Sequence, residues 1–396
     1  MKKDNLTYLV GGSMPEPRPT VPYADEACSF LGGLSDLLMR QRSMPDVVSF
    51  AFFCRRANIA RLKREFGDSE RRLGRGLAFH ITPSNIPINF AFSLAFGILS
   101  GCANVVRAPT KPWPQVDAVC RAVRELLDRP EFALMKGRVA VVRYERDDEI
   151  TGYFSGSCDA RIIWGGDASV RSIRGIPIPP RAVEITFADR YSLCVLDERA
   201  ILDLDEAGLE RLADDFYNDT YLVDQNACSS PNLIFWLGRG APEAREKFWG
   251  AVHERAKKYD LQAVHAMDKY SLLCDYLIRR PDVEGVSFHD NIVYRVKLAS
   301  LRDIESCRGR FGLFFEYGAA DIGELAPHVT KRWQTLTYYG ADRDMLVRFV
   351  SENSLSGIDR IVPVGCALDI GVLWDGFDIV RTLSRILEVR YAVGRK

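Results

Sequence analysis

Hydrophobic residues follow two alternating patterns between residues 76 and 166. Short, nearly continuous apolar runs predict buried β-strands, whereas longer segments with apolar residues three or four positions apart predict helices. The strand-like runs are Gly76–Ile81, Cys102–Pro109, Arg138–Tyr144 and Ala160–Gly166, and the helical segments are Ile88–Leu99 and Gln115–Leu127. Strands that alternate with helices in this way predict a mostly parallel, doubly wound α/β sheet.

Both patterns continue on either side of this region. Helical spacing in Asp25–Arg40 and Val47–Phe66 predicts helices that cover one face of a sheet. A second α/β unit is expected from about Glu198. Its predicted helices are Glu206–Tyr217, Ala241–Tyr259 and Val264–Arg279, and its predicted strands are Leu233–Leu237, Ile292–Leu298 and Gly312–Tyr317. At the carboxyl end we expect a helix over Phe377–Leu387 and a strand over Glu388–Val393.

Composition and charge exclude several classes of protein. The 396 residues suffice for two domains with sizeable cores. Lysine plus arginine and aspartate plus glutamate both total 53, so nothing indicates a nucleic-acid or anionic-membrane partner. The longest apolar stretch, Ile86–Leu99, is too short to span a bilayer, and the first residues carry no secretory signal. We therefore expect a cytoplasmic protein without a membrane span.

The ten cysteines are scattered, with no CxxC pair and no histidine–cysteine cluster at zinc spacing. This distribution predicts reduced thiols and no metal site. Cys228 lies in the stretch Asp224–Pro231, between a predicted helix and a predicted strand. A loop of small and polar residues could hold a thiolate against a substrate carbonyl. The alternative is that Cys228 is a small buried apolar residue, as most cysteines are.

Two predicted strand ends offer candidate ligand-binding groups, because ligands of doubly wound sheets bind where strands end and helices begin. One is His80–Pro87, in which prolines fix the backbone and polar side chains can donate or accept hydrogen bonds. The other is Trp164–Ser169, whose glycines would let the backbone approach a pyrophosphate. For Trp164–Ser169, the alternative is a strand-to-helix turn that binds no ligand. The usual GxGxxG and P-loop fingerprints do not occur in the sequence.

Four blocks of the sequence resemble the aldehyde dehydrogenase superfamily. More closely, they resemble the acyl-CoA reductases that supply long-chain aldehyde to bacterial bioluminescence. The blocks, in the order of that family, are His80–Lys111 (HITPSNIPINFAFSLAFGILSGCANVVRAPTK), Ile162–Asp197, Asp224–Phe235 (DQNACSSPNLIF) and Gly357–Arg385. The resemblance spans roughly residues 76 to 390. It implies an aldehyde dehydrogenase-like fold, with a doubly wound Rossmann-type cofactor domain and a second α/β catalytic domain.

The resemblance also implies catalytic roles. Cys228 falls on the catalytic cysteine, which would need a lowered pKa to act as a thiolate. Asn85 would donate to the thioester oxygen, with the backbone N–H of Cys228 as the second donor. Glu184 falls on the general base, but Thr186 and Phe187 replace the glycine pair that usually follows it. We expect a weakened base, which suits a reductase because a competent base would promote hydrolysis of an enzyme thioester.

The implied cofactor is NADPH, with NADH as the alternative. The residues expected to contact it lie in two loops: Thr82, Pro83 and Ser84 beside the nicotinamide, and Gly165, Gly166 and Asp167 beside the pyrophosphate. The family's usual lysine for the adenosine ribose or its 2′-phosphate is replaced by Arg107, with Lys111 a little beyond. Either cation would suit a 2′-phosphate.

We therefore expect three parts: N-terminal helices with a dinucleotide-binding domain (1–197), a catalytic domain (198–355), and a segment that closes the domain interface and can oligomerise (356–396). The predicted reaction is NADPH-dependent reduction of a fatty acyl-CoA, or of another acyl thioester, to the aldehyde through a cysteine thioester. Three alternatives stay open: an acyltransferase that loads the cysteine for a partner protein, an aldehyde dehydrogenase running oxidatively, and a catalytically inactive member that only binds a partner. Candidate partners are an acyl-protein synthetase and a second copy of the chain.

Overall fold

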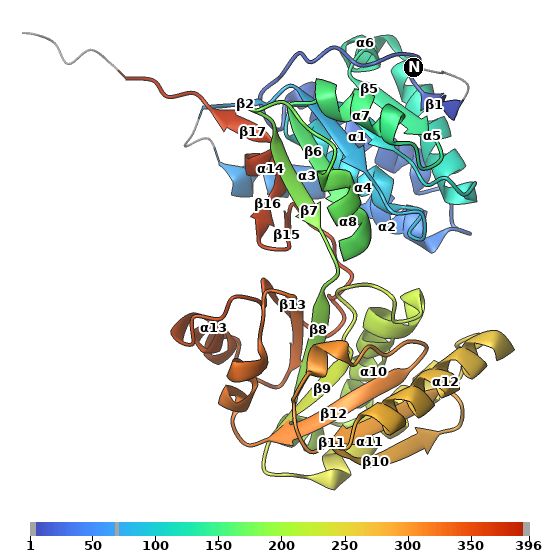
Figure 1. The fold of residues 1–396 in the computed structure, drawn as a ribbon, viewed down its shortest axis with the longest axis vertical. Helices are drawn as coiled ribbons and strands as arrows, with labels where there is room; N and C mark the ends of the chain where they lie inside the picture. Colours follow the sequence, from blue (N-terminus) through green and yellow to red (C-terminus); the bar gives the residue numbers. More distant parts are fainter. Residues whose placement is uncertain (1–4, 68–70, 391–396) are drawn as a thin grey trace, which may run out of the picture. The chain divides into compact units, whose positions relative to one another are not determined.

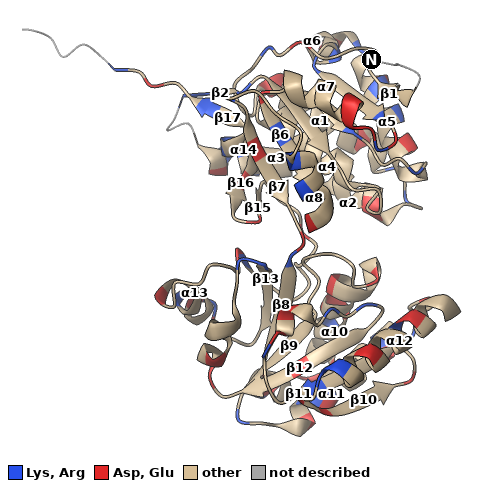
Figure 2. Ribbon diagram, viewed as in Figure 1, with Lys and Arg blue, Asp and Glu red and all other residues tan. Residues whose placement is uncertain are grey.

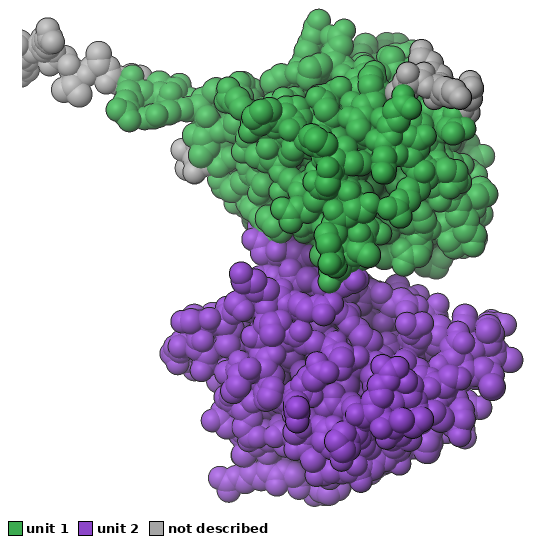
Figure 3. Space-filling model, in the orientation of Figure 1, with its two compact units in different colours: residues 1–188, 377–396 green, residues 189–376 purple. Residues whose placement is uncertain are grey.

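The computed structural model describes residues 5–67 and 71–390. They form two compact units, which Figure 3 colours separately. The first unit contains the described residues up to Ala188 and those from Phe377 onward, and the second is the continuous segment Asp189–Gly376. Both units carry acidic and basic residues (Figure 2), in keeping with the zero formal net charge.

Figure 1 shows the fold as a ribbon. The first unit is built on a six-stranded sheet in the order β1-β5-β4-β3-β6-β7. Its strands are β1 Thr7–Val10, β3 Leu77–Ile81, β4 Ala103–Arg107, β5 Val139–Arg143, β6 Ala160–Trp164 and β7 Val183–Phe187. All neighbouring pairs are parallel except β1 with β5. The chain runs outward from β3 through β4 to β5 and then returns to the other side of β3, so the carboxyl ends of β3 and β6 form a topological switch point.

Helices lie on both faces of this sheet. They are α1 Asp25–Leu38, α2 Pro45–Phe53, α3 Arg56–Phe66, α4 Asn89–Leu99, α5 Pro114–Leu127, α6 Ala133–Lys136, α7 Asp148–Ser157 and α8 Asp167–Arg174, with a 3-10 turn at Pro130–Phe132. All residues of α4 are buried, which explains why this helix is apolar around its whole circumference. Phe92 of α4 packs against Phe50 and Phe53 of α2, with ring centroids 5.1 and 5.5 Å apart.

Two local predictions for this unit are wrong. The single helix expected over Val47–Phe66 is two helices, because Arg55 adopts an extended conformation between α2 and α3. The helix expected over Phe377–Leu387 is replaced by β16 Phe377–Asp378, α14 Ile379–Thr382 and β17 Ser384–Ile386. Pairing of β17 with β2 (Arg72–Gly74) overrides the helical pattern. Residues 388–390 form no strand, and the rest of the expected final strand lies outside the described residues.

The second unit is built on a seven-stranded sheet in the order β10-β11-β12-β9-β8-β13-β14. Its strands are β8 Tyr191–Asp197, β9 Leu233–Leu237, β10 Val283–His289, β11 Val293–Leu298, β12 Leu313–Ala319, β13 Trp333–Tyr339 and β14 Arg360–Pro363, with a short β15 at Leu373–Trp374. Only β10 runs antiparallel to its neighbour within the large sheet. The antiparallel β10 is therefore an edge strand on an otherwise parallel sheet.

Two apolar cores lie on opposite faces of this second sheet. One combines inward residues of β8, β9 and β12 with helices α10 and α11, and the other combines the alternate residues of those strands with α12 and α13. The helices are α9 Glu198–Leu202, α10 Glu206–Thr220, α11 Pro242–Ala256, α12 Ala263–Arg279 and α13 Arg343–Glu352, with 3-10 turns at Tyr221–Val223, Ile304–Ser306 and Ile322–His328.

The doubly wound α/β fold predicted from the sequence is confirmed in both sheets. Most expected helices and strands appear within a few residues of their predicted bounds, including α4, α5, α12, β3 and β9. Within residues 5–67 and 71–390, no helix has the length and apolar character needed to cross a bilayer.

Candidate active site

The loop that carries Cys228 is held by a buried glutamine. Asp224 and Gln225 both adopt left-handed backbone conformations, with φ of 54° and 58°, which turns the chain sharply after the Tyr221–Val223 turn. The Gln225 amide nitrogen donates to the carbonyls of Pro231 and Leu313 at 3.1 and 3.0 Å. Its amide oxygen accepts from the backbone N–H of Gly312 at 3.2 Å. Gln225 therefore closes the loop on itself and ties it to the start of β12.

A second amide strengthens the same connection. The Asn232 side chain accepts from the backbone N–H of Gly309 at 2.8 Å, and the Asn232 carbonyl accepts from the N–H of Phe315 at 3.0 Å. The backbone N–H of Phe311 donates to the Asp224 carbonyl at 3.2 Å. The segment 309–315 is thus fastened along the Cys228 loop, although the two are far apart in the sequence.

Cys228 is a free, partly exposed thiol on the wall of a pocket of about 320 Å³. Its carbonyl accepts a 2.7 Å hydrogen bond from the hydroxyl of Ser192 on β8. The pocket is polar and mostly cationic, since three arginines and one aspartate line it. The lining residues are Asp189, Gln225, Asn226, Ala227, Cys228, Asn232, Arg308, Gly309, Arg310 and Arg332. An electrophile entering this pocket would meet the sulfur in a positively charged setting.

Burial raises the pKa of the Cys228 thiol above its ordinary value. The backbone N–H of Arg190 and the guanidinium of Arg308 act in the opposite direction, and the carboxylates of Asp375 and Asp189 add to the increase. A lowered pKa was expected from the sequence, and the structure shows the reverse balance. The thiol is therefore mainly protonated at neutral pH, and the groups that lower its pKa control how much thiolate forms.

The expected nicotinamide loop follows β3 in the first unit, and it is connected to the loop after β4. The hydroxyl of Thr82 donates to the Arg107 carbonyl at 2.6 Å. Ser84 lies 3.3 Å from the Thr110 hydroxyl, and its carbonyl accepts from the Trp113 indole at 3.1 Å. Because β3 and β4 are parallel neighbours, their carboxyl ends bring these two loops together.

Four other predicted site residues lie in or beside these two loops. Pro83 is partly buried and Asn85 is exposed on the surface of the loop. The Lys111 ammonium lies 4.3 Å from the centroid of the Trp113 ring, a cation–π contact. The Arg107 guanidinium lies 4.5 Å from the Tyr144 ring and donates to the Tyr144 carbonyl at 3.2 Å. Its Nε is buried without a hydrogen-bond partner among the described residues.

The glycine turn lies at the end of β6, next to β3 in the sheet. The backbone N–H of Gly165 donates to the Phe187 carbonyl at 3.1 Å, and Gly166 is the N-cap of α8, whose first residue is Asp167. The register of β3 with β6 pairs Ile81 with Ile163, so Thr82 and the glycine turn leave the sheet at the same edge. The structure therefore gathers the predicted cofactor-binding loops at the carboxyl ends of β4, β3 and β6.

Both carboxylate oxygens of Glu184 are paired with arginines in the first unit. Oε2 accepts from Arg161 Nε at 2.7 Å, and Oε1 lies 2.9 Å from Arg174 Nε. Arg161 is almost completely buried and also donates to the Ser155 hydroxyl and the Ile176 carbonyl at 3.1 and 2.8 Å. Glu184 is thus held in an ion-pair network on β7.

A buried polar chain beneath the cofactor loops was not predicted from the sequence. His80 Nδ1 lies 2.7 Å from the Ser93 hydroxyl, and the indole of Trp164 donates to the same hydroxyl at 2.9 Å. His80 Nε2 lies 3.1 Å from the Asn104 amide oxygen. Burial lowers the pKa of His80 to about 4, so the imidazole is neutral. These hydrogen bonds link β3, α4 and β6 next to the predicted nicotinamide and pyrophosphate loops.

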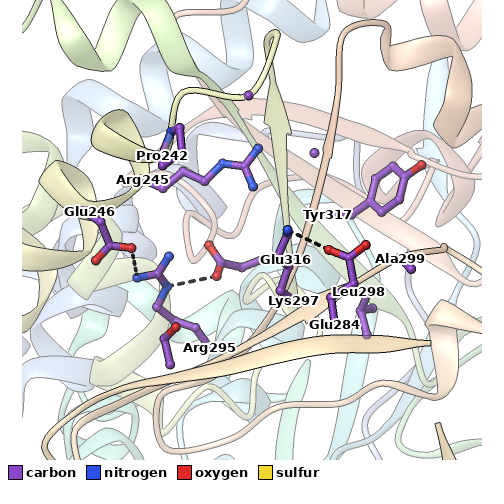
Figure 4. A pocket seen from close by; sticks show the side chains of 13 residues that line it. Pro242, Arg245, Glu246, Glu284, Arg295, Lys297, Leu298, Ala299, Glu316 and Tyr317 are labelled. Carbon is purple, nitrogen blue, oxygen red and sulfur yellow. Dashed lines mark hydrogen bonds and ion pairs between the residues drawn. The ribbon is translucent and has the colours of Figure 1, made fainter. Parts of the chain in front are cut away.

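The second unit contains another pocket, of about 530 Å³, that the sequence did not indicate (Figure 4). Its charged groups pair with one another. The carboxylate of Glu316 accepts from Arg295 Nε at 2.9 Å, and Arg295 also lies 2.7 Å from Glu246. Lys297 pairs with Glu284 at 2.7 Å on the neighbouring strand. Within the described ranges, no group of three or more histidine, cysteine, aspartate or glutamate side chains is arranged to hold a metal ion.

A sequence model described as acyl-CoA reductase (LuxC) matches residues 20–388. A search of curated proteins finds no match to this sequence.

Solved structures with the same fold are aldehyde dehydrogenases and related enzymes. A 1-pyrroline-5-carboxylate dehydrogenase variant from Thermus thermophilus is 13% identical with a TM-score of 0.63, over 92% of this chain and 81% of that one. An oxidoreductase from Marinobacter aquaeolei is 13% identical with a TM-score of 0.64, over 94% of this chain and 87% of that one. An NAD-dependent benzaldehyde dehydrogenase from Corynebacterium glutamicum is 13% identical with a TM-score of 0.60, over 93% and 85%.

The chain spans less than half of a further similar structure, the proline utilization A protein of Bradyrhizobium japonicum, of which it covers 43%. At such low identities the likeness of structures establishes the fold. The family model covers most of the sequence and adds the reaction class. The chain belongs to the acyl-CoA reductase (LuxC) family and is an oxidoreductase with an aldehyde dehydrogenase-like fold.

Proposed function

We propose that this protein reduces an acyl-CoA thioester to the aldehyde with NADPH, through a thioester on Cys228. The observation that carries the proposal is the position of Cys228, a free thiol on the wall of a cationic pocket, in a loop fixed by Gln225 and Asn232. A thiol fixed in this way can attack a carbonyl without reorganising its own loop.

In the proposed first step the Cys228 sulfur attacks the thioester carbonyl after losing its proton. A new carbon–sulfur bond forms, the bond to the carrier's sulfur breaks, and the carrier leaves as a thiol that takes up a proton. The acyl group is then stored on Cys228. Asn85 and the backbone N–H of Cys228 are the proposed donors to the oxyanion of the tetrahedral species.

The first unit offers a site that suits a phosphorylated dinucleotide. The unpaired buried Nε of Arg107 is a donor without a partner among the described residues, beside a loop that also carries Lys111. At Gly165 an added Cβ would meet only the Cβ of Ser169, at 3.5 Å, so the backbone of the Gly165–Gly166 turn is the proposed contact of the pyrophosphate. Thr82, Pro83, Ser84 and Asp167 are the remaining proposed contacts. When bound, the reduced nicotinamide would supply the hydride that converts the acyl group to the aldehyde, and the Cys228 thiolate that leaves would take up a proton.

The ion pairs of Glu184 support reduction over hydrolysis. A general base must accept a proton from water, but both Glu184 oxygens already accept from guanidinium groups. Acting as a base would require Glu184 to give up one of these pairs. We therefore propose that the enzyme thioester is protected from water by a weakened base at Glu184, which disfavours oxidation of aldehydes to acids.

The test is NADPH consumption with acyl-CoAs of graded chain length, with NADH assayed in parallel. We expect thioester-dependent oxidation that is lost in Cys228→Ala and retained in Cys274→Ala, which removes another free, partly exposed thiol. Acyl loading of Cys228 without NADPH consumption would instead favour an acyltransferase. The absence of both NADPH oxidation and acyl loading would refute the proposal.

A further inference from the structure

We infer that Arg308 is the positioning residue that favours the thiolate form of Cys228. The inference rests on the proposed function, in which Cys228 is the nucleophile. Arg308 and Cys228 line the same pocket. Arg308 reaches that pocket from the segment before β12, which follows the cysteine by some eighty residues and has no local motif of its own.

The backbone around Arg308 is fixed on both sides. The backbone N–H of Arg308 donates to the Tyr276 hydroxyl at 2.8 Å, and that hydroxyl donates to the Arg308 carbonyl at 3.0 Å. The next residue, Gly309, donates to Asn232 in the Cys228 loop. The position of Arg308 relative to Cys228 is therefore set by short hydrogen bonds rather than by a flexible loop.

The side chain of Arg308 is held as well. Its Nη1 donates to the Arg190 carbonyl, and its guanidinium lies 5.5 Å from the centroid of the Tyr191 ring. The backbone N–H of the same Arg190 is a hydrogen-bond donor that lowers the pKa of Cys228. Arg190 thus holds the Arg308 guanidinium through its carbonyl, while its N–H favours the Cys228 thiolate. This arrangement holds a fixed positive charge near the nucleophile.

Other charged groups face the same sulfur. Asp189 and Asp375 disfavour the thiolate, while Arg310 and Arg332 line the pocket with Arg308. Arg310 and Arg332 are exposed, so solvent screens their charges more effectively than that of the partly buried Arg308. The electrostatic balance therefore lies between Arg308 on one side and the two aspartates on the other.

The consequence is a thiol that is neutral at rest, with Arg308 setting the pH at which it loses its proton to solvent. Arg308 acts through Cys228, so its removal should change the pH dependence of thiol reactivity. A purely structural role would change stability and leave that dependence in place.

The experiment measures alkylation of Cys228 by iodoacetamide over a series of pH values, in the full chain, with the modified peptide identified by mass. Arg308→Gln should react roughly tenfold more slowly than wild type at neutral pH, with its profile moved to higher pH. Arg308→Lys, which keeps the charge, should restore most of the rate. Arg302→Gln, at an exposed arginine of the same segment that does not line the pocket, is the control and should follow the wild type, whereas Asp375→Asn should move the profile to lower pH.

A wild-type profile in Arg308→Gln would overturn the inference. If that variant does not fold, Arg308→Met keeps the apolar stem over Tyr191 and tests the same charge. A Cys228 that reacts no faster than Cys274 at any pH would overturn the proposed function and this inference with it. If Cys228 is reactive but the pH profile of its alkylation does not depend on Arg308, only the inference is overturned.

Discussion

The two pockets of the second unit differ in how their charges are satisfied. In the larger pocket, of about 530 Å³, Arg295 pairs with Glu316 and Glu246, and Lys297 pairs with Glu284 (Figure 4). In the smaller pocket, of about 320 Å³, three arginines and one aspartate surround a thiol. In the larger pocket the cations are paired with carboxylates, whereas the smaller one combines a free thiol with an excess of positive charge. Chemistry, rather than size, distinguishes the candidate active site.

The larger pocket should therefore behave as part of the core. Glu316 is 3% exposed, and one of its oxygens accepts from the indoles of Trp236 and Trp249 at 2.8 and 2.7 Å. Glu316→Ala would leave Arg295 and two indole N–H groups buried without that partner. We expect a loss of about 3–5 kcal/mol in the free energy of unfolding, measured by urea denaturation. A loss below about 1 kcal/mol would show that the charges of the larger pocket are not part of the core, and the contrast between the two pockets would fail.

The smaller pocket should respond to pH instead. Burial raises the pKa of Cys228, so at neutral pH only a small fraction of the thiol is ionised. Alkylation of wild-type Cys228 should therefore accelerate about tenfold for each pH unit until the pH reaches the thiol pKa. The measurement is the rate of iodoacetamide modification. A rate that is already maximal at neutral pH would mean that the cationic lining outweighs burial.

Ser192 tests how firmly the cysteine loop must be held. Ser192→Ala removes the 2.7 Å hydrogen bond to the Cys228 carbonyl, and we expect a loss of about 1 kcal/mol in stability with slower acyl reduction. Thr337→Val is the control, because its hydroxyl donates at 3.3 Å to the Leu193 carbonyl, away from the cysteine loop. Equal effects of both variants on the rate would argue against a special role for the Ser192 contact.

The smallest effect is expected at the rim of the larger pocket. Glu284 and Lys297 form a pair in which the side chains are 44% and 56% exposed. Glu284→Gln should change the free energy of unfolding by less than about 1 kcal/mol, because solvent and salt screen exposed pairs. Comparison with Glu316→Ala distinguishes the contribution of an exposed ion pair at the rim from that of a buried one. A large loss would show that the pairing network extends to the surface.

Much of the fold could be predicted because its strands are buried on both faces. The apolar runs at β3, β4, β5 and β6 stand out from the amphipathic segments between them, so both type and order are evident. β7 was not predicted, since Glu184 and Thr186 interrupt its apolar pattern. The β2–β17 pairing could not be predicted either, because it joins segments from opposite ends of the chain.

The candidate site was predictable only in part, for a similar reason. Cys228 and the strand-end loops carry local signals of turns, small residues and glycines. Arg308 has none, since it reaches the cysteine through contacts such as Gly309 with Asn232, which are 77 residues apart in the sequence. The pairing of Glu184 with Arg161 likewise follows from neighbouring strands rather than from spacing.

The discontinuity of the first unit has a consequence for synthesis. Arg72 and Ser384, which meet where β2 pairs with β17, are separated by 312 residues, and the whole second unit is translated between them. On the ribosome the second unit can complete its sheet as soon as its own segment has emerged. The first unit must wait for β17 with the edge of β2 unpaired. The last step of folding should thus be closure of the first unit, and chains truncated before Ser384 should expose that edge to aggregation.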